Sequence, residues 1–303
     1  MRDDPIADWR LFLRVVEAGG IAAVAVEMRT EASTVSRRLA ALERRLSVRL
    51  VQRSTRRSTP TEAGRLYYER LRHILEEVDA LEAEVRGEAN GPSGLLRVSA
   101  PVDFGALFVG PWLLELHRLH DGLRTELLLD DRYVDLVGQG IDVAIRIGRL
   151  ADSGHVARRL GAMTLVLVAT DSYLDRRGRP EQPDDLEDHD FVLYSWLQAR
   201  DQLALTGPDG ATARVRAPSR FAVNSAGAAV RVVEAGGGVH AAPLWLVADA
   251  LAAGRLERVL PGWSPPTYDV HALYTGGRHV PARVRALVDH LVAKTSEVPG
   301  MVR

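Results

Sequence analysis

One predicted helix carries, on a single face, the residue types that contact nucleic acid. Apolar residues recur at helical spacing at Val35, Leu39, Leu42 and Leu46, and this stripe should face a protein core. The opposite face is short and polar and holds Ser33, Thr34, Ser36, Arg37, Arg38 and Ala41. Hydroxyl and guanidinium groups can bond to base edges and phosphates in a DNA groove. The face could therefore bind DNA, although an ordinary three-helix core with a solvated basic face would give the same short pattern.

Positive charge is concentrated around this helix. Positions 29 to 57 hold nine arginines and two acids, a local net charge of +7, whereas the whole chain of 303 residues has a net charge of −1. Neutralising DNA phosphates requires such a cluster of cations. The cluster therefore favours DNA binding and confines a nucleic-acid partner to the N-terminal part of the chain.

The preceding segments should hold this helix in place. An amphipathic helix is predicted across 9–16 and a shorter one across 21–28, with Gly19-Gly20 between them. Together with a turn across 29–32, they give the order of a helix-turn-helix.

A hairpin should follow the predicted DNA-contacting helix. Residues 49–53 alternate like a strand, and a polar, basic stretch leads to Thr59-Pro60, as in a two-stranded wing. Such a wing would carry Arg53, Arg56 and Arg57 towards a minor groove. The alternative is a solvated loop, which the neighbouring basic helix makes less attractive.

A long helix is predicted next, with Thr61 as its N-cap. Its apolar residues alternate spacings of four and three, the period of a coiled-coil seam. The seam residues are Tyr67, Leu71, Ile74, Val78, Leu81 and Val85. The simplest role of this helix is to pair two subunits into a homodimer. Asn90 to Gly94 should end it and mark a domain boundary.

The remaining residues, 95–303, alternate strand-like and helical runs, which indicates an α/β unit with mostly parallel sheets. In such sheets a ligand binds beyond the carboxyl ends of the strands, against helix N-termini. The candidate effector residues at these positions are Ser99, Ala100, Pro101, Arg146, Gly148, Asn224 and Ser225. The alternatives stay open: Ser99 and Ser225 could be simple N-caps, and Arg146 could pair with an acid such as Asp142.

Several chemistries find no support in the sequence. The chain has no cysteine, its nine histidines are scattered without metal-ligand spacing, and no phosphate-binding loop motif occurs. The acid pairs Asp130-Asp131 and Asp184-Asp185 are better explained as solvated turns or helix caps than as catalytic pairs. We therefore expect no enzyme activity, metal or cofactor. No run of ~18 apolar residues and no apolar leader occur, so we expect a cytoplasmic protein without a membrane partner.

At this point the chain resembles the LysR-type transcriptional regulators. The matching residues are Thr34-Val35-Ser36-Arg37-Arg38-Leu39, Ala41-Leu42-Glu43, Arg49-Leu50, Arg53-Ser54, Arg56 and Thr61-Glu62-Ala63-Gly64. Further on, Val134-Asp135-Leu136-Val137, Gly140 and the run from Asp142 to Gly148 are similar to one branch of the same family. The resemblance covers nearly the whole chain.

The resemblance implies a multidomain α+β and α/β protein. It divides the chain into a winged helix-turn-helix (1–60), a linker and dimerisation helix (61–90) and a periplasmic-binding-protein-like effector domain (91–303). That domain would have one lobe from about 91–161 and 264–303 and a second lobe from about 162–263. The family also suggests a homotetramer and a small-molecule effector between the lobes, which we expect to be anionic because helix N-termini converge there with Arg146.

The chain departs from its family between positions 28 and 32. Comparable regulators usually have leucine, glycine, an apolar residue, serine and glutamine there, whereas this chain has Met28, Arg29, Thr30, Glu31 and Ala32. Arg29 is expected in a left-handed turn unless the turn has another shape, and Thr30 is the expected new N-cap. Glu31 and the lost glutamine should weaken or alter operator binding.

Two function classes fit these patterns. The first is a ligand-responsive transcription factor, and the second is a small-molecule-binding protein whose N-terminal helices only mediate assembly. The basic wing and the missing leader favour the first.

Overall fold

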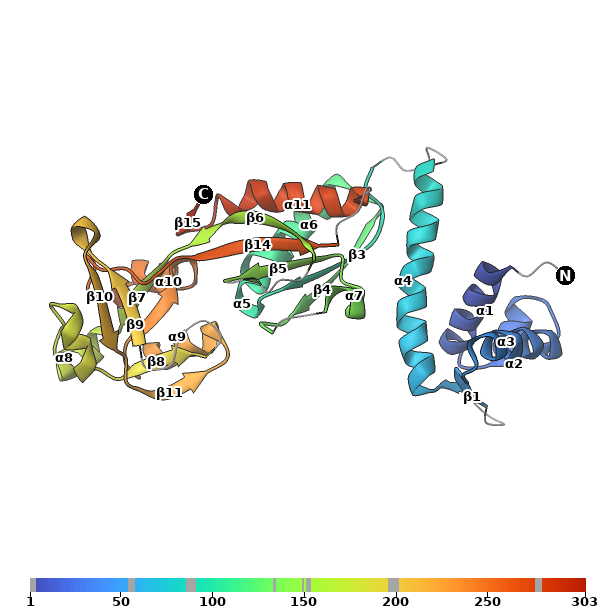
Figure 1. Ribbon diagram of the computed structural model, residues 1–303, viewed down its shortest axis with the longest axis horizontal. Helices are drawn as coiled ribbons and strands as arrows, with labels where there is room; N and C mark the ends of the chain where they lie inside the picture. The colour runs from blue at the N-terminus through green and yellow to red at the C-terminus, as the bar shows by residue number, and fades with distance from the viewer. Residues whose placement is uncertain are drawn as a thin grey trace. The chain divides into compact units, whose positions relative to one another are not determined.

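A computed structural model describes residues 4–53, 58–85, 91–132, 135–148, 150, 154–195, 202–275 and 280–303. The chain divides into two compact units, residues 1–95 and 96–303 (Figure 1). Each unit has its own apolar core.

The N-terminal unit begins with the predicted helix-turn-helix. Its helices are α1 (Pro5–Glu17), α2 (Ile21–Glu27) and α3 (Ala32–Leu46). Phe12, Val24 and Leu39 are buried where these helices pack together. The expected stripe on α3 is confirmed at Val35, Leu39 and Leu42 but is wrong at Leu46, which is 37% exposed because the last turn extends past the core.

The predicted hairpin wing is present as β1 (Val51–Arg53) and β2 (Ser58–Pro60), paired antiparallel. The Glu43 carboxylate on α3 accepts hydrogen bonds from the backbone N–H groups of Leu50 (2.9 Å) and Val51 (3.1 Å). Two charge-assisted bonds of this kind fix the wing to the helix that precedes it. The wing tip, with Arg56 and Arg57, lies outside the described residues.

Helix α4 (Glu62–Val85) starts where the sequence predicts it. The Thr61 hydroxyl accepts a hydrogen bond from the Gly64 N–H at 2.9 Å, so Thr61 is the N-cap. A Cβ at Gly64 would lie 1.9 Å from the Leu50 carbonyl oxygen. Glycine is therefore the residue that lets α4 approach the backbone just before β1, and α4 then packs against α1.

The first lobe of the C-terminal unit is built on a sheet of strand order β15-β6-β14-β5-β3-β4 in the described part of the chain. The strands are β3 (Gly94–Ala100), β4 (Leu123–Leu129), β5 (Val143–Ile147), β6 (Val156–Met163), β14 (Tyr268–Tyr274) and β15 (Met301–Val302). The helices are α5 (Val102–Phe104), continued through the π-helical η1 (Gly105–Val109) into α6 (Gly110–Leu119), with α7 (Leu136–Gln139) and α11 (Ala282–Thr295). Helix α11 runs along β6 and contacts α6 (Figure 1).

The second lobe contains the sheet β12-β7-β13 and the strand pairs β11-β8 and β10-β9. Its strands are β7 (Leu165–Ala169), β8 (Phe191–Tyr194), β9 (Gln202–Thr206), β10 (Thr212–Arg216), β11 (Ser219–Val223), β12 (His240–Pro243) and β13 (Glu257–Arg258). Its helices are α8 (Asp171–Arg177), α9 (Ala226–Glu234) and α10 (Leu244–Ala252), with 3₁₀ turns η2 (Pro183–Asp188) and η3 (Pro208–Gly210).

Strands β6 and β14 carry the chain between the lobes, out through β6 to β7 and back from β13 to β14. Strand β14 returns in the direction opposite to β6 and is paired antiparallel with it. It is also antiparallel to β5 on its other side. Strands β12 and β13 are also antiparallel to β7, whereas β3–β5 and β8–β11 are parallel. The expectation of mostly parallel sheets is therefore wrong: repeated strand–helix alternation in the sequence does not reveal strands that return.

Candidate functional site

The polar face predicted on α3 is present at the surface of the N-terminal unit. Ser33, Arg37 and Ala41 are exposed, and Thr34 and Ser36 are partly exposed. Arg37 lies along the first turn of α3, donating to the Ser33 carbonyl (3.4 Å) and the Thr34 hydroxyl (3.2 Å). The first turn of the helix thus presents hydroxyls and a guanidinium group together.

Arg38 takes a different position. Its Nε donates to Asp8 of α1 at 2.7 Å, and the two side chains are 25% and 19% exposed. Arg38 therefore also ties α3 to α1, a role that helical spacing alone does not reveal. Arg53 ends β1, while Arg56 and Arg57 lie outside the described residues.

The unusual turn before α3 is partly as expected. Arg29 has φ 51°, so it adopts the left-handed conformation that glycine favours. Thr30 is not the N-cap, which corrects that expectation. Glu31 occupies the N-cap without a side-chain capping bond, and its carboxylate instead accepts from the Ser33 hydroxyl at 3.0 Å.

Two basic residues that were not among the predicted DNA-binding residues also help shape this unit's surface. Arg44 and Arg49 are exposed and line a shallow hollow of about 620 Å³ where α3 ends. Their proximity follows from the left-handed Ser47 (φ 54°), which turns the chain back from α3 towards β1. The signal in the sequence is the run of arginines around the end of the predicted helix.

The predicted seam on α4 is divided between two environments. Leu71 is 2% exposed and belongs to the core of its own unit, and the Tyr67 ring packs on Phe12 with centroids 5.5 Å apart. Ile74 and Leu81 are 47% and 61% exposed. Val78 is partly exposed, and the side chain of Val85 lies outside the described residues. Tyr67 and Leu71 thus serve the subunit's own core, and the predicted seam residues that are exposed lie further along the helix.

In the C-terminal unit a cavity of about 120 Å³ lies between the lobes. Pro101, Phe104 and Arg146 line it from the first lobe, and Tyr194 and Trp245 line it from the second. The Arg146 side chain is buried and donates to the Ser99 hydroxyl at 2.8 Å. The hydrogen bond to Ser99 thus holds the Arg146 side chain in place.

The other predicted effector residues surround this cavity without lining it. Ala100 is fully buried in β3, Asn224 is exposed, and Ser225 caps α9 by accepting from the Ala228 N–H at 3.2 Å. Gly148 has φ 99° and its N–H donates to the Asp269 carbonyl, so it forms a turn. The N-cap alternative therefore holds for Ser225.

Two acids line the cavity instead: Asp131, which the sequence analysis interpreted as part of a turn or cap, and Asp103, which it did not consider. Asp131 accepts from the Val102 N–H at 3.0 Å at the start of α5, and Asp103 accepts from the Gly227 N–H at 2.8 Å at the start of α9. Asp131 is thus a helix cap, one of the two roles expected for the acid pair. Burial raises the pKa of the Asp131 carboxyl above its ordinary value, and Asp103 and Asp130 add to that rise against hydrogen bonds from Val102 and Tyr194.

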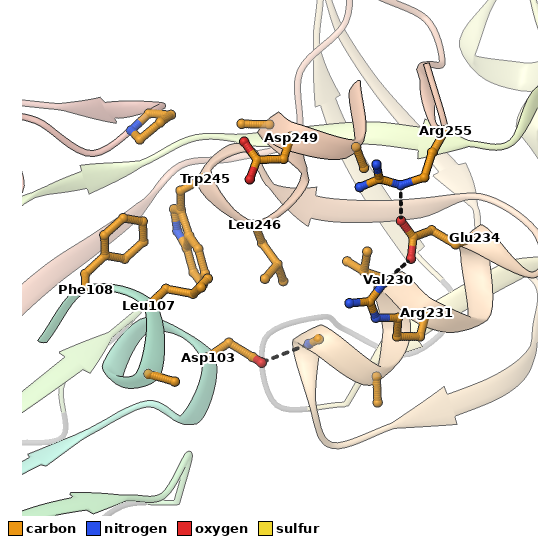
Figure 2. A pocket seen from close by; sticks show the side chains of 16 residues that line it. Asp103, Leu107, Phe108, Val230, Arg231, Glu234, Trp245, Leu246, Asp249 and Arg255 are labelled. Atoms are coloured by element: carbon orange, nitrogen blue, oxygen red, sulfur yellow. Dashed lines mark hydrogen bonds and ion pairs between the residues drawn. The ribbon is translucent and has the colours of Figure 1, made fainter. Parts of the chain in front are cut away.

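A larger groove, of about 650 Å³, adjoins this cavity and shares Asp103 and Trp245 with it. Figure 2 shows Asp103 pointing from α5 to the backbone at the start of α9. On the far side of the groove Glu234 pairs with Arg231 (2.7 Å) and Arg255 (3.2 Å) (Figure 2).

Comparison with known proteins agrees with both units. Residues 6–65 match the bacterial regulatory helix-turn-helix protein, lysR family, and residues 89–296 match the LysR substrate binding domain. The chain belongs to the LysR family of transcriptional regulators. It is therefore a DNA-binding, ligand-responsive regulator with a helix-turn-helix unit and an effector-binding unit.

Other LysR-family proteins align over nearly the full length. The chain is 34% identical to the transcriptional activator AaeR of Escherichia coli K12, over 95% of this chain and 93% of that protein. It is 36% identical to the regulator PtxR of Pseudomonas aeruginosa, over 92% of this chain and 89% of that protein.

Among solved structures, full-length AphB of Vibrio cholerae has 28% identity and a TM-score of 0.59, covering 97% of this chain and 99% of that one. CrgA of Neisseria meningitidis has 26% identity, a TM-score of 0.60 and the same coverage of 97% and 99%.

Within the described residues, no cluster of histidine, aspartate and glutamate side chains has the arrangement of a metal site. No described helix of this LysR-family protein is long and apolar enough to span a membrane.

The raised pKa of Asp131 gives a testable pH dependence. The folded state binds the Asp131 proton more tightly than the unfolded state does. Ionised Asp131 therefore lowers the free energy of unfolding at neutral pH, and this loss of stability disappears as the pH falls through the raised pKa. Asp131→Asn should therefore unfold at a higher temperature than the wild type at pH 7, and the difference should shrink towards pH ~4, near the ordinary aspartate pKa.

Thermal unfolding of both proteins across this range measures the difference, and Asp121→Asn controls for the loss of one exposed charge. A variant that is less stable than the wild type at pH 7 would show that the ionised carboxylate stabilises the fold.

Proposed function

We propose that α3 enters the major groove of operator DNA while the wing contacts the adjacent minor groove. The supporting observation is the exposed first turn of α3, where hydroxyls and Arg37 lie together and no side chain caps the helix. The N–H groups of an uncapped helix start favour a phosphate. Ser33, Thr34, Ser36, Arg37 and Arg38 would act from α3, and Arg53, Arg56 and Arg57 from the wing.

We also propose that a small molecule binds between the two lobes at Arg146 and thereby changes DNA binding or transcription. Arg146 is the one basic side chain among the described residues that line the cavity, which supports an anionic group on the effector. Regulators of this kind act on DNA in the cytoplasm and have no catalytic role. We propose the same for this chain, with domain boundaries near residues 60 and 90.

The arginine assignments can be tested on the DNA upstream of the protein's own coding region, with the variants Arg37→Ala, Arg38→Ala and Arg56→Ala. A variant whose arginine binds a phosphate should reduce the slope of log affinity against log salt by about one. A variant whose arginine binds a base edge should instead cost roughly 1–3 kcal/mol at one base pair. Fluorescence anisotropy at several salt concentrations distinguishes the two effects.

Arg176→Ala, exposed on α8, is the matched control for removal of a surface arginine. Asp8→Ala tests the double role of Arg38, because it removes the partner on α1 and leaves the guanidinium group. If the triple alanine variant keeps both its affinity and its salt slope, these arginines do not contact DNA.

We propose that α4 pairs two subunits through the exposed part of the seam, and that such dimers associate into tetramers. Ile74 and Leu81 would otherwise leave apolar surface in water. Ile74→Glu combined with Leu81→Glu should produce monomers, measured by light scattering coupled to size-exclusion chromatography.

Arg65→Glu is the matched control, since Arg65 is exposed on the same helix and, nine residues from Ile74, lies on the opposite face. An oligomer that survives the double change but not the control would place the subunit contact on the other face of α4.

The effector site can be tested with small organic acids in a thermal-shift screen. A ligand at about 100 times its dissociation constant should stabilise the protein by about 2.7 kcal/mol. Arg146→Ala should weaken the best acid by about 10- to 100-fold, the range expected when a charged hydrogen bond is removed.

Arg146→Lys retains a positive charge and should lose less affinity. A set of hits that are all neutral or cationic, and that bind the Arg146→Ala variant equally well, would contradict an anionic effector at this site.

A further inference from the structure

The N-terminus of α9 is bonded from both lobes. Ser225 caps it from its own segment, through the Ala228 N–H at 3.2 Å. Asp103 reaches it from α5 in the other lobe, 124 residues away in sequence, and accepts from the Gly227 N–H at 2.8 Å (Figure 2). The first N–H groups of a helix are those that would bind an anionic ligand. A protein carboxylate therefore occupies this position.

Gly227 is shaped to this contact. A Cβ at Gly227 would lie 2.4 Å from Oδ1 of Asp103. Gly227 is not among the glycines with positive φ, and glycine is a poorer helix former than alanine. The close approach of Asp103 therefore explains why position 227 is glycine. Neither the backbone conformation nor helix propensity explains it.

The second helix start beside the interlobe cavity is occupied in the same way. Asp131 accepts from the Val102 N–H at the start of α5, and both aspartates line the cavity with Arg146. An anionic ligand in this cavity meets two carboxylates, and the starts of α5 and α9 already have a carboxylate partner. Arg146 is then the one basic side chain for it among the described lining residues.

We propose that Asp103 is a latch and a specificity-determining residue of the interlobe site. Its carboxylate ties α9 to the first lobe and keeps a second anionic group of the ligand away from the α9 N-terminus. The site thus selects a ligand with one anionic group, held by Arg146, over a dianion of similar length. This proposal rests on the proposed effector site and further specifies that its ligand has one anionic group.

The latch is tested first without any ligand. The chain has no cysteine, so Arg118→Cys on α6 and Asp184→Cys in η2, both exposed, can carry two spin labels, one on each lobe. Electron–electron distance measurements on the full-length protein, diluted with unlabelled protein, report the separation of the lobes within a subunit. Asp103→Ala and Gly227→Ala should both give longer and broader distance distributions.

The two latch variants act differently on α9 itself, which separates loss of the latch from loss of the fold. Gly227→Ala improves the helix while its methyl group displaces the carboxylate, so it should open the lobes without lowering helix content. Ser225→Ala is the matched control, because it removes a cap of the same helix that does not cross the cleft. Distributions that are unchanged in both Asp103→Ala and Gly227→Ala, or changed as much in Ser225→Ala, would overturn the latch.

The specificity is tested by calorimetry with butyrate and succinate as mono- and dianionic probes. Asp103→Ala should raise the affinity for succinate relative to butyrate at least about tenfold over the wild type, since a charged hydrogen-bond position becomes open. An unchanged ratio would overturn the specificity role of Asp103. Failure of the effector site itself would appear separately, as wild-type probe binding that Arg146→Ala does not alter.

Discussion

The free N–H groups at helix starts are a constraint that side chains meet in both units. The side chains of Asp4, Thr61 and Thr170 each accept a hydrogen bond from first-turn N–H groups, of α1, α4 and α8 respectively. Each of these residues directly precedes its helix. At the cleft the same requirement is met over long distances, by Asp131 for α5 and by Asp103 for α9. Such bonds are worth most where the helix start is partly buried, because an unpaired N–H would otherwise lose its water.

Helix α3 does not follow this arrangement, and neither do α2, α10 and α11. Glu31 at its N-cap makes no capping bond, and the Glu31 carboxylate holds the Ser33 hydroxyl instead. The helix is fixed by other contacts, namely Arg38 to Asp8 on α1 and Glu43 to the start of the wing. Its first turn stays exposed to solvent, as the proposed entry of α3 into a DNA groove requires.

The cleft shows how the same physics changes the expected ligand chemistry. Helix starts beside an arginine suggest an anion site from the sequence, because backbone dipoles and a guanidinium group both attract negative charge. In the folded chain the aspartates supply that negative charge themselves. Burial then raises the pKa of Asp131, which means that its ionised form is unfavourable in the folded chain. A ligand, a proton or a movement of the lobes can relieve this unfavourable free energy.

The sequence by itself determined the elements, because periodicity, capping residues and turn residues are local. These local patterns were enough to predict the helix-turn-helix, the Thr61 cap, the wing strands and the family. Tertiary structure alone decided what distant side chains do: Arg38 pairs with Asp8, Leu71 belongs to its own core, and Asp103 meets Gly227. It also decided that β14 returns antiparallel between β5 and β6. These contacts join residues far apart in the chain, and no spacing rule connects such residues before the fold brings them together.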